Sequence, residues 1–155
     1  MNAKSLILFT ASFVLLSFVK GQNRKKDSVA VVAAFERLAG ICDYGYNAKP
    51  GEDSIRYAHA AKYLVYRGDN KQRAWKVLMD YANPADKNVV EELLSKFKRS
   101  IVRDCNHHFV KYFTEKESEG IWHVLVVEYE KKSGARQVSY AFLKIGNRFG
   151  LGDID

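Results

Sequence analysis

The sequence predicts an α+β fold in which N-terminal helices pack on a curved antiparallel β-sheet. In the first part of the chain, apolar residues recur at steps of three and four, which is the period of a helix. After Ser100 the apolar residues alternate with polar ones, and turns that contain glycine separate the alternating stretches. Helices followed by a run of neighbouring strands are typical of one sheet covered by helices.

Residues 1–21 have the layout of a secretory signal peptide. Lys4 supplies a positive charge, an apolar stretch of 14 residues covers 6–19, and Val19 and Gly21 are small residues at the expected cleavage site. A membrane-spanning helix needs about 20 apolar residues, so this stretch is short for an anchor. We therefore expect an exported protein, periplasmic or secreted, with no stable membrane span after signal cleavage.

Cleavage after Gly21 would leave a basic flexible stub over 22–26 and a single domain over 27–155. The whole chain has a net charge of +7, but the lysines of the signal and the basic residues of the stub leave the domain with only +2. Such a weak field argues against nucleic acid as a partner. No motif in the sequence indicates a cofactor or a metal, so neither is expected.

Four helices are expected before the strands. The first begins at Asp27 or Ser28, which suit an N-cap, and its apolar face carries Val31, Phe35 and Leu38. A loop is expected to follow over 40–53. The other helices are expected over 55–66, 71–81 and 84–100.

The start of the last helix is the clearest boundary in the sequence. Asn83 suits the N-cap, Pro84 suits the first helical position, and Asp86 places an acid in the first turn.

The remainder of the chain is expected to form four strands. The segment 121–130 (IWHVLVVEYE) is rich in β-branched and aromatic residues. Gly146-Asn147 reads as a two-residue hairpin turn, which sets Ile145 opposite Arg148. The strands are expected over 102–113, 121–130, 136–145 and 149–154.

The hairpins also predict which side chains share a face of the sheet. The expected register sets Phe142 opposite Leu151, Tyr140 opposite Asp153, Tyr129 opposite Val138 and His123 opposite Lys144. The face toward the helices should carry His123, Leu125, Val127, Tyr129, Val138, Tyr140, Phe142, Phe149, Leu151 and Asp153. The other face is also apolar at its centre, and an exposed face of that kind usually marks a contact surface. We therefore expect a homodimer through Trp122, Val124, Val126 and Leu143.

The closing segment 142–155 (FLKIGNRFGLGDID) resembles the last hairpin of the nuclear-transport-factor-2-like (cystatin-like α+β) superfamily. The order of elements, helices and then an antiparallel sheet, is similar as well. The resemblance implies a cone in which the helices and the concave face of the sheet enclose a pocket. Members of this superfamily include isomerases, dehydratases, epoxide hydrolases and binding or accessory modules without activity, so the fold does not supply a function. No catalytic motif of the superfamily matches this sequence residue by residue.

His123, Tyr140 and Asp153 are the candidate catalytic residues. In the expected register all three point toward the pocket, where they could supply a general base and a phenolic donor to a developing oxyanion. Alternatively, Asp153 accepts a hydrogen bond from Tyr140 or a backbone amide, and His123 pairs at the rim, because buried polar groups need partners. The expected contacts for a small apolar ligand are Tyr129, Phe142 and Lys144.

Cys42 and Cys105 are the only cysteines, and an exported chain enters an oxidising compartment. They either form a disulfide, which would close a loop of about 63 residues and contribute about 4 kcal/mol, or remain buried thiols that pack as small hydrophobic groups.

His107 and His108 are neighbours on an expected strand, so their side chains point to opposite faces and cannot chelate one ion. Cys105 shares a face with His107, but two ligands fall short of the three or four that zinc needs.

The sequence favours an exported, non-catalytic binding or accessory domain of unknown ligand. One alternative is a small pocket enzyme of the isomerase or lyase type that acts on a small apolar molecule. Another is a protein-interaction domain that dimerises through its outer sheet face.

Five of the nine tyrosines lie within 44–66, where they could line the mouth of a cavity or cover one end of the core.

Overall fold

The computed structural model of the chain describes residues 25–42, 52–68, 77–101, 106–131 and 134–155. The predicted signal peptide, most of the predicted loop at 40–53, and residues 71–76 of the predicted third helix lie outside these ranges. No helix within them is both long and apolar enough to cross a membrane.

The first predicted helix is confirmed, and it covers residues 25–42. Lys25 and Lys26, which the sequence assigned to the basic stub, are already helical. Neither Asp27 nor Ser28 is therefore the N-cap. The Ser28 hydroxyl instead donates a hydrogen bond of 2.9 Å to the Lys25 carbonyl, three residues earlier.

The second predicted helix is shorter than expected. It forms α2 (Glu52–Ala61), and the chain then leaves the helix so that Leu64 can pair with Leu151 and Val65 with Leu78. The prediction of a third helix over 71–81 is wrong for residues 77–81, which are not helical. There the Met79 amide donates a hydrogen bond of 2.9 Å to the Leu64 carbonyl.

The last predicted helix is confirmed as α3 (Pro84–Ser100). The Asn83 side chain caps it by accepting a hydrogen bond of 3.1 Å from the Ala85 amide, and Pro84 occupies the first position. Asp86 places its negative charge in the first turn, near the positive end of the helix dipole.

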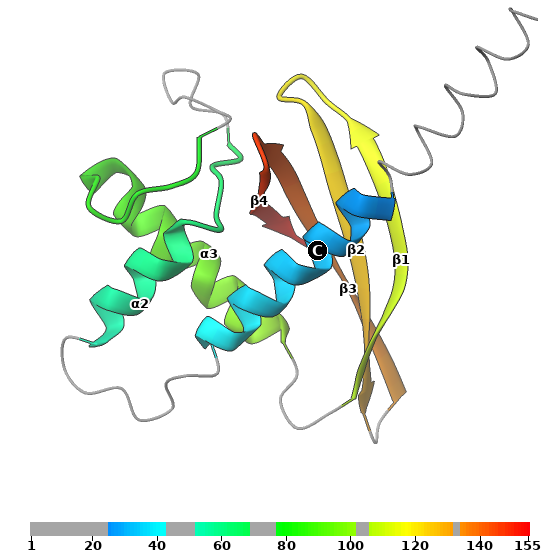
Figure 1. Cartoon of the computed structure of the whole chain (residues 1–155). Coiled ribbons are helices and arrows are strands. Elements are labelled where there is room, and N and C mark those ends of the chain that lie inside the picture. The colour runs from blue at the N-terminus through cyan, green and yellow to red at the C-terminus, as the bar shows by residue number, and fades with distance from the viewer. Residues whose placement is uncertain (1–24, 43–51, 69–76, 102–105, 132–133) are drawn as a thin grey trace, which may run out of the picture.

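The strands form one four-stranded antiparallel sheet, in the spatial order β1-β2-β3-β4. The α+β class and the order of helices before strands are therefore confirmed. In Figure 1, α2 and α3 lie together on one side of the sheet, and helix 25–42 runs from beside α2 toward β1. The strands are β1 (His107–Lys116), β2 (Ile121–Lys131), β3 (Gly134–Ile145) and β4 (Arg148–Ile154).

The predicted register is confirmed at the last hairpin and wrong further from it. Ile145 lies opposite Arg148, and Phe142 opposite Leu151, as expected. A β-bulge then leaves Gly152 without a partner, so that Tyr140 faces Ile154 instead of Asp153.

Between β2 and β3 the register differs from the prediction by two residues. Val127 lies opposite Val138, and His123 lies opposite Phe142 instead of Lys144. Because a shift of two leaves every side chain on its face, the predicted inner face is largely confirmed. The buried residues of that face are His123, Leu125, Val127, Tyr129, Val138, Tyr140, Phe142, Phe149 and Leu151.

Phe35 lies at the centre of the core between helices and sheet. Its ring makes edge contacts with Phe97 of α3, Tyr140 of β3 and Phe109 of β1, with centroids 5.6, 4.9 and 5.7 Å apart. Edge-to-face pairs of this kind contribute about 0.5–1.5 kcal/mol each beyond their buried area. Phe35 therefore joins all the layers of the fold.

The outer side of the sheet near β4 is covered by the segment that follows α2. The Val65 amide donates a hydrogen bond of 2.9 Å to the Leu151 carbonyl, and the Leu151 amide donates one of 2.8 Å to the Tyr63 carbonyl. Val65 then packs on Trp122 and Leu143 in a second, smaller core.

The packing of Val65 on Trp122 and Leu143 contradicts the expectation that the outer face of the sheet is exposed. Trp122, Val124 and Leu143 are buried in their own chain, with 1%, 6% and 2% of their surface exposed. The expectation that these residues face water is therefore wrong, and of the four predicted interface residues only Val126 is partly exposed. The homodimer itself stays a prediction.

Two glycines allow this close approach. A Cβ atom on Gly152 would lie 2.6 Å from Cη2 of Trp122 and 3.1 Å from Cγ1 of Val65. A Cβ atom on Gly150 would lie 2.8 Å from Cδ2 of Leu78.

We predict that Gly152→Ala lowers the free energy of unfolding by about 1–3 kcal/mol, because the new methyl group overpacks against the buried Trp122 ring. Urea unfolding followed by tryptophan fluorescence measures the change. Gly40→Ala is the matched control, because no atom lies within 4 Å of its new Cβ and alanine suits a helix better than glycine. An unfolding midpoint for Gly152→Ala equal to that of the wild type would contradict the packing described.

Candidate functional site

His123 is buried, with 4% of its surface exposed, and it is fully engaged in the fold. Its Nδ1 atom shares a hydrogen bond of 2.6 Å with the Tyr112 hydroxyl, and its ring packs edge-on against Phe149 at 4.9 Å. Burial lowers the pKa of His123 below 6.5, an effect that the positive charge of Lys144 reinforces and the negative charge of Asp27 opposes. A buried imidazole of this kind stays neutral at pH 7.

Tyr140 lies in a buried chain of hydroxyl groups. The Ser100 hydroxyl donates a hydrogen bond of 2.7 Å to the Phe97 carbonyl, so it can only accept from the Tyr140 hydroxyl, 2.9 Å away. The Tyr129 hydroxyl, at 2.8 Å, then donates to the Tyr140 oxygen. Burial raises the pKa of Tyr140, although its hydrogen bonds to Ser100 and Tyr129 oppose the rise.

Asp153 belongs to a third, separate network near the outer face. Its carboxylate accepts from Arg67 at 3.0 Å and from Lys96 at 3.3 Å. Arg67 also donates to Glu117 at 2.9 Å, and its guanidinium carbon lies 4.6 Å from the centre of the Trp122 ring. Arg67 and Lys96 thus hold the end of β4 in place.

The structure therefore does not bring the candidate catalytic residues together. Tyr140 and Asp153, expected to be cross-strand neighbours, are separated by the bulge at Gly152, and each has its own partners. His123 pairs with Tyr112 instead of either of them.

The predicted ligand contacts also have structural partners. Tyr129 and Phe142 are buried in the core with 1% and 0% of their surface exposed. Lys144 lies on the surface, where it forms an ion pair of 2.6 Å with Asp27.

The adjacent histidines have different partners, as the strand alternation predicts. His107 Nε2 lies 3.3 Å from a Glu36 carboxylate oxygen, and His108 Nε2 lies 3.0 Å from one of Glu130. The part of the chain that the structure describes contains no group of three or more possible metal ligands.

Cys42 is buried, and Cys105 lies outside the described residues, so the disulfide stays a prediction.

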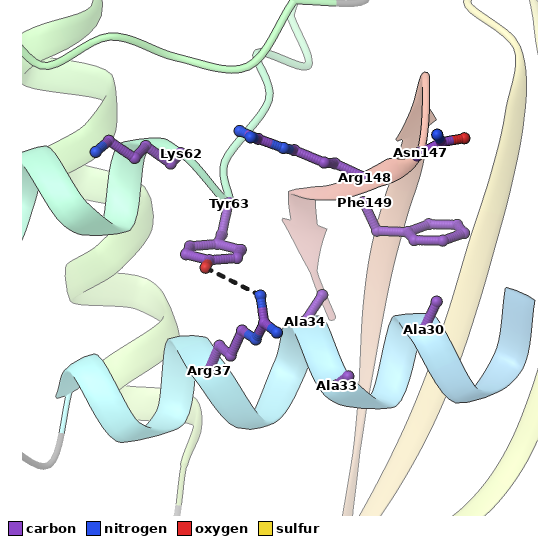
Figure 2. Close-up of a pocket in the computed structure, with 9 residues that line it drawn as sticks. All are labelled: Ala30, Ala33, Ala34, Arg37, Lys62, Tyr63, Asn147, Arg148 and Phe149. Atoms are coloured by element: carbon purple, nitrogen blue, oxygen red, sulfur yellow. Dashed lines mark hydrogen bonds between the residues drawn. The ribbon is translucent and has the colours of Figure 1, made fainter.

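A cleft of about 360 Å³ opens between helix 25–42, the end of the α2 segment and the β3–β4 hairpin. Figure 2 shows Arg37 rising from the helix toward Tyr63, and Arg148 extending from the start of β4 over the same space. The Arg37 guanidinium donates a long hydrogen bond of 3.4 Å to the Tyr63 hydroxyl. The apolar part of the lining consists of Ala30, Ala33, Ala34 and Phe149.

The charge of this cleft has one sign. Arg37, Lys62 and Arg148 line it, and no aspartate or glutamate among the described residues does. None of these three cations has an acidic partner within the described ranges, whereas Arg56, Arg67, Lys96 and Lys144 all do. Positive charge and hydrogen-bond donors are thus left available beside an apolar surface.

A second, wider hollow of about 870 Å³ shares the wall formed by Arg37, Lys62 and Tyr63. On its far side it is lined by Ile41 and Ile55, which are apolar, together with Gly40, Arg56 and His59. Arg37 and Lys62, which line both hollows, therefore lie between two apolar surfaces.

The sequence contained a signal for part of this cleft. Ala30 and Ala34 are four residues apart, as are Ala33 and Arg37, which places small side chains and one cation along a single stripe of the helix. Among the tyrosines of 44–66, Tyr63 does line a cavity, as one alternative proposed. Periodicity could not reveal that Lys62 and Arg148 would lie opposite this stripe.

Comparison of the chain with protein-family models, with curated proteins and with solved structures gave no match.

We predict that stability falls as the pH drops below about 6.5 and that His123 causes part of the fall. The unfolded chain takes up a proton on this histidine near pH 6.5, while the folded protein, whose His123 pKa is lower, does not. Protons therefore favour the unfolded state until the pH falls through the lower, folded-state pKa. His123→Asn should show a smaller loss of melting temperature between about pH 7.5 and about pH 5.5.

His59→Asn, which removes an exposed histidine, is the control and should keep the wild-type pH dependence. Differential scanning calorimetry at several pH values measures the slopes. Equal slopes for His123→Asn and the wild type would show that this histidine titrates alike in the folded and unfolded chains.

Proposed function

We propose that the protein is an exported, non-catalytic binding domain that takes a small amphipathic anion in the cleft between helix 25–42, Lys62–Tyr63 and the β3–β4 hairpin. The observation that carries the proposal is the set of three cations, Arg37, Lys62 and Arg148, beside apolar residues, in a lining whose described residues include no acid.

The charge of the cleft supports an anionic ligand. Arginine binds carboxylate, sulfonate and phosphate groups through charge-assisted hydrogen bonds, which are about twice as strong as neutral ones. An arginine already engaged in an ion pair would have to give up that partner first. Arg37 and Arg148 have none among the described residues, so within that part of the chain no acid competes with a ligand anion for either group.

The apolar lining supports an amphipathic ligand over an inorganic ion. Three alanines and Phe149 form the apolar part of the lining, and apolar groups leave water on contact with such a surface. A volume of about 360 Å³ falls at the small end of the range for ligand sites. It suits a compact ring or a short alkyl chain that carries one acidic group.

The non-catalytic part of the proposal is supported by the fate of the candidate catalytic residues. His123, Tyr140 and Asp153 hold three separate parts of the fold together, and none of them lines the cleft.

Export and the finer fold class belong to this proposal as well. The signal-like segment 1–21 supports export, to the periplasm or the medium. The resemblance of segment 142–155, together with helices that precede an antiparallel sheet, supports a cone-shaped domain of the nuclear-transport-factor-2-like superfamily. That superfamily contains both enzymes and binding modules, so the cleft, and not the fold, carries the function proposed.

We predict that the fluorescent anion 8-anilinonaphthalene-1-sulfonate binds to the cleft and that Arg37→Gln weakens its binding about tenfold, because a charge-assisted hydrogen bond contributes about 1.5–3 kcal/mol. Fluorescence titration measures the dissociation constants. Arg148→Gln should have a similar effect, and Arg136→Gln, which removes an exposed arginine from β3 away from the cleft, should have none.

An uncharged probe with the same rings, N-phenyl-1-naphthylamine, tests the role of charge. Its affinity should be equal for the wild type and for Arg37→Gln. Binding of the sulfonate that neither cleft variant weakens would overturn the proposal, and so would an equal weakening of both probes, since the arginine would then only shape the cavity.

A further inference from the structure

The two edges of the sheet differ. The β4 edge is covered by residues 63–65 of the same chain, through the hydrogen bonds between Val65, Tyr63 and Leu151. On the other side, β1 (His107–Lys116) pairs with β2 along one edge, and no described strand pairs with its second edge. A ten-residue strand with one unpaired edge is a template for another strand.

The residues of β1 are exposed and partly apolar. Phe109 and Val110 are 40% and 45% exposed, and Val29 of the neighbouring helix is 65% exposed. These residues border one shallow groove beside the strand. Exposed apolar side chains that gather along an open strand edge are typical of a contact surface.

Two charged residues of β1, Lys111 and Glu115, lie at equal distances in the sequence from Phe113. Lys111, Phe113 and Glu115 lie at steps of two, so they share a face of the sheet. The Lys111 ammonium lies 4.7 Å from the centre of the Phe113 ring, which confirms the shared face for these two. Lys111 and Glu115 are both exposed, and neither forms an ion pair within the described chain.

We propose that two copies of this chain associate edge to edge through antiparallel pairing of their β1 strands, with Phe113 on the two-fold axis. In this register Lys111 faces the partner's Glu115, and Glu115 faces the partner's Lys111. The two Phe113 rings meet between these ion pairs. The dimer then contains one continuous sheet in which both β1 edges are paired.

The same charges disfavour two other registers. If Lys111 lay on the axis it would face the partner's Lys111, and if Glu115 lay there it would face the partner's Glu115. Like charges directly opposite each other destabilise a strand pair, so both of these registers are less stable than the one proposed. Lysine on an edge strand ordinarily discourages pairing, and here the matching glutamate converts it into a selective contact.

Charge exchange tests this proposal. The full chain is expressed in a host that exports it, and the exported protein is studied by sedimentation equilibrium. The wild type should dimerise reversibly. Lys111→Glu sets glutamate against the partner's Glu115, and Glu115→Lys sets lysine against the partner's Lys111. Because symmetry applies each change twice, either variant should weaken the dimer on the order of tenfold.

The double variant Lys111→Glu/Glu115→Lys restores the opposite charges and should recover the wild-type dissociation constant within about twofold. All these positions are on the surface, and circular dichroism checks that each variant is folded. Val126→Asn is the comparison for the outer sheet face, and it should leave the proposed register intact because it places no charge opposite Lys111, the cross-strand neighbour of Val126.

Recovery in the double variant supports the proposal, because only pairing between positions 111 and 115 predicts it. A wild type that is monomeric at about millimolar concentration overturns it, since no interface of functional strength would then exist. A dimer that Val126→Asn breaks and Lys111→Glu spares overturns it in favour of the outer face.

Discussion

The two hydrogen bonds that join residues 63–65 to Leu151 are the constraint on which the rest of the structure depends. They bring the segment after α2 beside β4, and this single placement has several effects at once. It buries Trp122 under Val65, it brings Arg67 to Asp153, and it sets Tyr63 opposite helix 25–42. The cleft therefore exists because the chain closes the β4 edge with its own backbone.

The polar residues inside the fold and those of the cleft have different tasks. Tyr140 and His123 are satisfied by partners of matched chemistry, which lets the core contain polar groups without the cost of leaving them unpaired. The cations of the cleft, Arg37 and Arg148, have no such ionic partner in the described chain. The presence or absence of such a partner, more than the residue type, distinguishes polar groups that stabilise the fold from those that are available to a ligand.

Two local sequence predictions are confirmed, one local prediction (the N-cap at Asp27 or Ser28) is wrong, and the predictions that depended on distant contacts were only partly right. The Asn83 cap and the Gly146-Asn147 turn depend on neighbours in the chain, and both are confirmed. The β2–β3 register was wrong by two residues, yet every face was kept because side chains alternate with a period of two. One bulge residue, Gly152, was enough to move Asp153 away from Tyr140. The cleft is also lined by Lys62 and Arg148, which lie far apart in the sequence. No local sequence pattern predicts that these two residues line the same cleft.

The closure of the β4 edge also has a consequence for the order of folding. The four strands are joined by short turns, so their pairing requires only the closure of small loops. Arg67 and Asp153, by contrast, are 86 positions apart, and bringing them together costs far more chain entropy. We expect the meander to form while the segment after α2 is still free, and the cleft between helix 25–42 and the β3–β4 hairpin to be completed in the last step.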